Sequence, residues 1–215
     1  MKKIFVLIAT VFVFKNCVFN AENSNQIIFD NSIQKKVENE IIDTFPKNQK
    51  GCGLDYINNL HLEYYSNDSL QKNNYSKLNF YSTWGIKGDS AEIYGLFGSE
   101  NAGSTGFKIN IVNGLPKVTL CIHPHIIGGH HAYTKDGKVE FNMNIPTKKS
   151  KIILSQMLDN QSSKIIYGYV EFETVDYYSV TKYENGKEIP NKRDKVRANL
   201  RVYFKANKCD SLLYE

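Results

Sequence analysis

Residues 196–205 read VRANLRVYFK, and this stretch decides the fold class. Its apolar residues alternate strictly with polar or charged ones: Val196, Ala198, Leu200, Val202 and Phe204. Successive side chains of a β-strand point to opposite faces of a sheet, so this period of two predicts a strand with one buried face and one solvated face. An amphipathic helix would instead need apolar residues three and four positions apart.

The same alternation recurs from about residue 54 to residue 206. Turn-forming pairs separate several of these segments: Asn113 with Gly114, Asp136 with Gly137, and Asn185 with Gly186. Such pairs between alternating segments indicate antiparallel hairpins. We also expect the glycine-rich segment 95–106 to be a hairpin loop. Without the spacing of βαβ units, this pattern predicts an antiparallel β-sandwich, with a closed β-barrel as the alternative. Uneven strand lengths make the sandwich our preference.

One helix is expected near the N-terminus, over about residues 31–45. Ile33, Val37 and Ile41 recur at intervals of four, and Pro46 follows the stripe. No internal repeat or linker divides the rest of the chain. We therefore expect residues 22–215 to form a single β-rich domain.

Residues 1–21 have the order of a secretory signal peptide. Two lysines follow Met1, an apolar run extends from residue 4 to residue 14, and the small residue Ala21 stands at the expected exit. The run is shorter than the roughly 20 residues of a membrane span, so no transmembrane segment is expected. Cys17 raises the alternative of a lipid anchor, which the bulky residues before it disfavour. We expect a periplasmic, cell-surface or secreted protein.

The charge of the exported chain is close to neutral. The 215 residues carry a formal charge of +5, and removal of the signal segment takes away three lysines and no acid, which leaves +2. No block of basic residues stands out. We therefore expect no nucleic-acid partner.

Three cysteines remain after such cleavage. Cys52 and Cys209 lie in polar or glycine-rich flanks near the two ends of the domain, and an exported protein meets oxidising conditions. We predict a disulfide between them. Cys121 lies inside an apolar strand pattern, where a buried thiol is expected. The alternative of three free thiols stays open, because spacing does not determine connectivity.

Four of the five histidines fall within nine residues: His123, His125, His130 and His131. Two histidines two apart on an extended segment share one side, and the two glycines at 128 and 129 allow the chain to turn back. Such a group is a candidate zinc or copper site in a metal-binding protein or metal-dependent hydrolase. The simpler interpretation, which we prefer, is a solvated glycine-rich loop.

Glu171 and Glu173 share one face of an expected strand. Paired carboxylates perform glycoside hydrolysis when they face each other across a cleft, so a carbohydrate-active enzyme is a weaker hypothesis. The simpler interpretation is a pair of glutamates on the solvated face of a sheet.

The last strand also carries candidate ligand contacts. Arg197, Arg201 and Tyr203 share its polar face, a cationic stripe suited to an anionic glycan, a phosphate headgroup or an acidic partner. Trp84, the only tryptophan, is a candidate for stacking on a ligand. The simpler interpretations are a solvated sheet face and a core anchor, respectively.

No complete set of catalytic residues emerges. The sequence therefore favours an exported, non-catalytic binding or interaction module, without a cofactor, for an unidentified protein, glycan or small ligand. The metal site and the carbohydrate-active enzyme are its alternatives.

Overall fold

The computed structural model describes residues 26–42, 54–57, 60–75, 78–99, 103–123, 132–133, 139–140, 143–180, 183–184, 187–188 and 193–209. Several sequence predictions fall outside these residues: the signal segment 1–21, Cys17, Cys52, His125, His130 and His131. The described chain is mainly β with one short helix, which confirms the predicted class.

Seven long strands form the centre of the structure: β6 (Leu78–Lys87), β7 (Ser90–Ser99), β8 (Gly103–Val112), β9 (Leu115–His123), β12 (Met143–Leu154), β13 (Ile165–Thr174) and β17 (Arg193–Lys208). Shorter strands flank them: β1 (Ile27–Phe29), β2 (Ile41–Ile42), β3 (Leu54–Ile57), β4 (Leu60–Ser66), β5 (Ser69–Tyr75), β10 (Ala132–Tyr133), β11 (Val139–Glu140) and β14 (Tyr177–Val180). β15 (Tyr183–Glu184) and β16 (Lys187–Glu188) pair separately.

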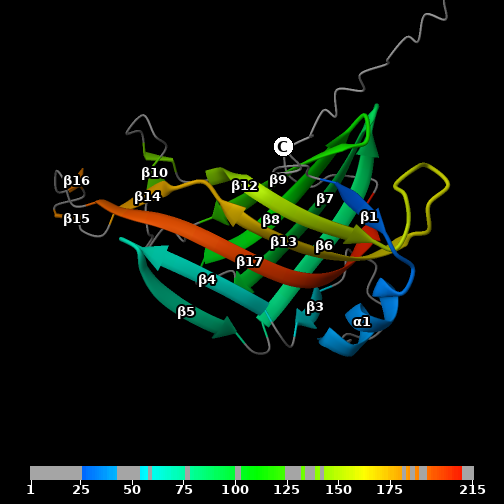
Figure 1. Ribbon diagram of the computed structural model, residues 1–215, viewed down its shortest axis with the longest axis horizontal. Helices are drawn as coiled ribbons and strands as arrows, with labels where there is room; N and C mark the ends of the chain where they lie inside the picture. The colour runs from blue at the N-terminus through cyan, green and yellow to red at the C-terminus, as the bar shows by residue number, and fades with distance from the viewer. Residues whose placement is uncertain are drawn as a thin grey trace, which may run out of the picture.

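The seven long strands pair in the order β6-β7-β8-β9-β12-β13-β17, and the pairing then returns to β6 (Figure 1). Each step is antiparallel except the last, where Asn207 and Lys208 of β17 pair in parallel with Thr83 and Trp84 of β6. The strands thus form a ring within one large mixed sheet. The predicted division into the two separate sheets of a sandwich is not confirmed.

Apolar side chains fill the inside of the ring. Four of the largest are Phe80, Trp84, Phe107 and Phe204, all buried. Gly168 leaves room for the aromatic side chain of Phe204, because a Cβ at position 168 would lie 2.7 Å from Phe204 Cε2. Gly95 does the same for Phe107. The glycine-rich segment 95–106 was predicted to be a hairpin loop. Its described residues instead belong to strands, because β7 extends to Ser99 and β8 begins at Gly103.

The helix α1 (Ile33–Glu40) is shorter than predicted. Asp30 Oδ1 accepts a hydrogen bond from the backbone N–H of Ser32 just before its first turn. Ile41 is already extended, and β2 pairs with β3. The two isoleucines of β2 are β-branched, which suits a strand. The pairing of β2 with β3 therefore ends the helix, although the spacing of apolar residues would have continued it. No helix in the described ranges is long and apolar enough to cross a membrane.

The apolar face of α1 covers part of the outside of the ring. Its buried residues Ile33 and Val37 pack against Ile153, Tyr167 and Tyr203 on β12, β13 and β17. The outer face of these three strands is therefore covered at one end. Beyond the helix the same face carries polar and charged side chains, and the candidate site lies there.

Candidate functional site: a polar groove on the outer sheet face

The candidate site is a groove of about 280 Å³ on the outer face of three adjacent strands. Its lining comes from β12, β13 and β17: Lys149, Ser150, Lys151, Glu171, Phe172, Glu173, Asn199, Leu200 and Arg201. We call this surface the polar groove. It exists because charged residues occupy alternate positions on all three strands and the register aligns them in rows.

One row crosses the sheet through Lys151, Glu171 and Arg201, which are direct cross-strand partners. Glu171 Oε1 lies 2.9 Å from Arg201 Nε. Tyr169 donates a hydrogen bond to Glu171 Oε2, at 3.0 Å. Burial is the main cause of a raised pKa of the Tyr169 hydroxyl, with the charge of Glu171 adding to it. This phenol is therefore a donor to the carboxylate throughout the neutral range.

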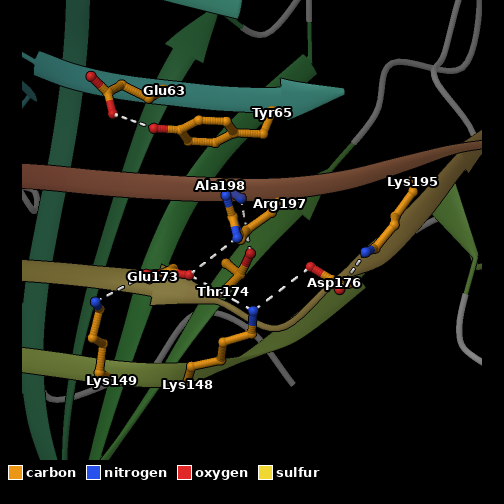
Figure 2. Close-up of polar contacts among 10 residues, drawn as sticks. All are labelled: Glu63, Tyr65, Lys148, Lys149, Glu173, Thr174, Asp176, Lys195, Arg197 and Ala198. Carbon is orange, nitrogen blue, oxygen red and sulfur yellow. Dashed lines mark hydrogen bonds and ion pairs between the residues drawn. The ribbon is translucent and has the colours of Figure 1, made fainter. Parts of the chain in front are cut away.

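The next row centres on Glu173, which meets three cations (Figure 2). Its carboxylate lies 3.2 Å from Lys149 Nζ, 3.7 Å from Lys148 Nζ and 3.6 Å from an Arg197 Nη atom. The register of β12 against β13 shifts between Thr147 and Lys149. The resulting irregularity brings two consecutive lysines to the same carboxylate.

Arg197 links this row to β4. Its guanidinium carbon lies 4.7 Å from the centre of the Tyr65 ring, a cation–π contact. Arg197 Nε and Asn199 Oδ1 are both buried and have no hydrogen-bond partner within the described residues. Most buried polar atoms of folded proteins are hydrogen-bonded, so these two atoms are exceptions in this part of the chain.

The charged row continues to the start of β14. Lys195 Nζ lies 3.0 Å from Asp176, and Lys148 Nζ lies 3.7 Å from the same carboxylate (Figure 2). The hydrogen bond from Lys195 is the main cause of a lowered pKa of Asp176. The same contact raises the pKa of Lys195. Both groups are therefore charged at neutral pH.

The fold unites two sets of residues that the sequence suggested separately. Glu171 and Glu173 lie beside Arg201 and Arg197, so the predicted acidic pair and the predicted cationic stripe are one ion-paired surface. Sequence reasoning did not single out Lys149 and Lys151. The lysine-rich run 148–151 was a signal for both, but only the strand register places it beside β13.

The two predicted aromatic contacts lie outside the groove. Trp84 is fully buried inside the ring of strands, where its indole N–H donates to the carbonyl oxygen of Lys164 at 3.3 Å. The faces of the indole are therefore not accessible to a ligand at the surface. The ring of Tyr203 lies 4.8 Å from that of Tyr169, in the cluster that α1 covers.

His123 is the only member of the histidine cluster in the described chain. Its Nε2 lies 2.9 Å from Tyr94 Oη, a hydrogen bond. The described residues contain no group of three histidine, cysteine, aspartate or glutamate side chains that could hold a metal ion. The zinc or copper site stays a prediction, because His125, His130 and His131 lie outside those residues.

Cys121 lies on the same strand as His123 and near Asn144, the residue types of a Cys–His–Asn hydrolase. However, the thiol donates a hydrogen bond to Asn144 Oδ1 at 3.3 Å, and burial raises its pKa to about 11. A thiol of this kind is protonated at neutral pH and is a poor nucleophile. We therefore interpret Cys121 as a packing residue, in line with its buried strand position.

Cys209 follows the end of β17, where its backbone N–H donates to the carbonyl oxygen of Trp84 at 2.9 Å. Its predicted disulfide partner Cys52 lies outside the described residues, so the bond stays a prediction.

Comparison of the chain with protein-family models, with curated proteins and with solved structures gives no match.

Proposed function

We propose that the protein is an exported, non-catalytic binding module and that the polar groove is its binding surface. The observation that carries the proposal is the groove itself, which is lined by charged and polar side chains of β12, β13 and β17. A ligand with hydroxyl or anionic groups can engage such side chains. Export is proposed from the order of residues 1–21.

The ion pairs support binding over catalysis. Glu171 is engaged by Arg201 and Tyr169, and Glu173 is engaged by three cations. Each carboxylate therefore orients its neighbours in a preformed surface. Glycoside hydrolysis would instead need two carboxyl groups that face each other across a cleft, whereas these two lie side by side on one face of β13.

A ligand screen with matched variants tests this proposal. The full chain is expressed with its N-terminal segment, recovered after export, and applied to a panel of neutral, acidic and basic glycans and extracellular proteins. The groove variant is the double substitution Lys149→Gln with Arg201→Gln. The control is Lys117→Gln, an exposed lysine on β9 outside the groove.

We expect at least one ligand to bind the natural chain and the control while losing affinity for the groove variant. If the groove variant retained every ligand with unchanged affinity, the binding surface would lie elsewhere and the proposal would be wrong.

A further inference from the structure

We infer that the ligand of the polar groove is a polyanionic glycan, a polysaccharide with sulfate or uronic-acid groups, laid across β12, β13 and β17. This inference rests on the proposed function, because it names the ligand class of the same groove. Five features of the described surface carry it: the outward position of its cations, a lysine that its carboxylates do not engage, the length of the charged array, the position of the groove away from a sheet edge, and the lack of an aromatic ring face in its lining.

The cations of the groove lie outermost and the carboxylates lie beneath them. The Lys149 side chain is 71% exposed against 20% for its partner Glu173. The Arg201 side chain is 60% exposed against 37% for Glu171. A molecule that approaches this face therefore meets ammonium and guanidinium groups first, while the carboxylates hold these groups in place.

The groove also contains a cation that its carboxylates leave unengaged. Lys151 lies directly opposite Glu171 in the register, yet Glu171 bonds to Arg201 and Tyr169 instead. No ion pair of Lys151 is found within the described part of the chain, and its side chain is exposed. It is available to pair with an anionic group of a ligand.

The array of cations is longer than a single small anion needs. The array consists of basic residues on two strands: Lys148, Lys149 and Lys151 on β12, and Lys195, Arg197 and Arg201 on β17. From Lys195 to Arg201 the strand extends roughly 20 Å at the usual rise per residue. Several charged groups of one chain can therefore be contacted at once, which favours a polymer.

The groove lies over the middle of the sheet rather than at its edge, and this argues against an acidic peptide. Residues 171–173 of β13 pair with β12 on one side and with β17 on the other. Extended peptides commonly bind by adding a strand to a free sheet edge. Here the ligand must rely on side chains, which suits the hydroxyl and anionic groups of a sugar.

Single-stranded nucleic acid is disfavoured because the groove offers no ring face on which a base can stack. Phe172 is buried and points into the core, and the guanidinium of Arg197 lies over Tyr65. Base stacking on aromatic rings is a main source of affinity in single-strand binding. The amide of Asn199, which belongs to the lining of the groove, is a polar group of the kind that bonds to a sugar hydroxyl.

The test measures binding of the exported full chain to dextran sulfate and to a heparin-type oligosaccharide by titration calorimetry, with neutral dextran as the uncharged comparison. The lysine variant is Lys149→Gln with Lys151→Gln, and the control is Lys36→Gln, an exposed lysine of α1. We expect saturable binding of both sulfated glycans and none of neutral dextran. The lysine variant should bind the sulfated glycans on the order of fivefold more weakly, and its affinity should fall less steeply with salt concentration, while the affinity of the control is unchanged.

Four results would overturn the inference: no saturable binding of either sulfated glycan, equal binding of neutral dextran, an equal loss in the control variant, or tighter binding of single-stranded DNA or polyglutamate of matched charge. A neutral ligand that binds the natural chain and is lost in the groove variant of the ligand screen would overturn the polyanion while retaining the binding module. Retention of all ligands by that variant would instead contradict the proposed function.

Discussion

Glu171 and Arg201 face each other across the boundary between β13 and β17, with Arg201 Nε 2.9 Å from Glu171 Oε1. Both side chains are substantially exposed, so water screens their attraction. The pair therefore orients the two side chains on the sheet surface and adds little to stability. Binding and folding can consequently be tested separately at this site.

We predict that Arg201→Gln changes the free energy of unfolding by less than about 1 kcal/mol, because exposed ion pairs contribute little. Urea unfolding followed by circular dichroism measures the change. A loss greater than about 2 kcal/mol would show that the pair has a structural role and would disqualify this substitution as a probe of binding.

Gly168→Ala should destabilise the ring of strands. A Cβ at this position would lie 2.7 Å from Cε2 of the buried Phe204 and closer still to Cζ, so the ring must move within a packed core. We expect a loss of about 1–3 kcal/mol in the free energy of unfolding, the usual cost of overpacking.

Chemical unfolding of the double variant Gly168→Ala with Phe204→Leu provides the control for that steric argument. The smaller side chain should lessen the cost of the alanine, so the effects of the two substitutions should not be additive. Additive losses would contradict the proposed clash.

Thr174→Val tests a buried side-chain hydrogen bond at the point where β13 ends. Thr174 Oγ1 accepts the backbone N–H of Ala198 at 2.9 Å, and both residues are buried. Valine keeps the shape but leaves this N–H without an acceptor, so we expect a loss of about 1–3 kcal/mol.

Thr147→Val is the matched control for Thr174→Val. Thr147 Oγ1 donates to the carbonyl oxygen of Val118, but the threonine is only half-buried, so water can replace the contact. Thermal unfolding of both variants should show the larger loss for Thr174. Equal losses would contradict the importance of burial.

Cys121 should react slowly with alkylating reagents in the folded protein. With a pKa of about 11, on the order of one thiol in a thousand is ionised at pH 8. Peptide-level mass spectrometry after iodoacetamide treatment, with and without urea, measures the protection of this residue. Rapid modification of the folded chain would show an accessible thiolate.

The same thiol makes stability depend on pH. Its pKa is raised above the ordinary value of 9.0, so the native state favours the protonated form. The stabilising contribution is fully present below about pH 9 and is lost as the pH rises toward 11. Cys121→Ala should weaken this alkaline loss, as measured by urea unfolding at pH 8 and pH 10.5.

The hairpin turn at Asn113 and Gly114 is a feature that neighbouring residues determine, so the sequence could predict it. Both residues have positive φ angles, 52° and 76°, as a tight turn between two strands requires, and the sequence predicted this turn. Ile41 shows the opposite case. Its apolar period extended the predicted helix, but its pairing with Ile57 of β3 makes it a strand residue.

The candidate site was predictable only in its parts. The alternation on the last strand correctly placed Arg197 and Arg201 on the face opposite Leu200, and Glu171 and Glu173 likewise shared one face of β13. Their joining into one surface depends on a register that pairs residues about 30 positions apart. No local pattern encodes such a pairing.

The sequence by itself determined the β class, the inward and outward faces of the strands and the turn at residues 113–114, because these depend on the period of two and on the conformations that individual residues tolerate. Only the tertiary structure decided that the strands join in a ring, that α1 covers part of its outer face and that lysines of β12 meet glutamates of β13. These features arise from hydrogen bonds and packing between segments that are distant in the sequence. Each strand could pair with many others, and only the complete fold selects its partner.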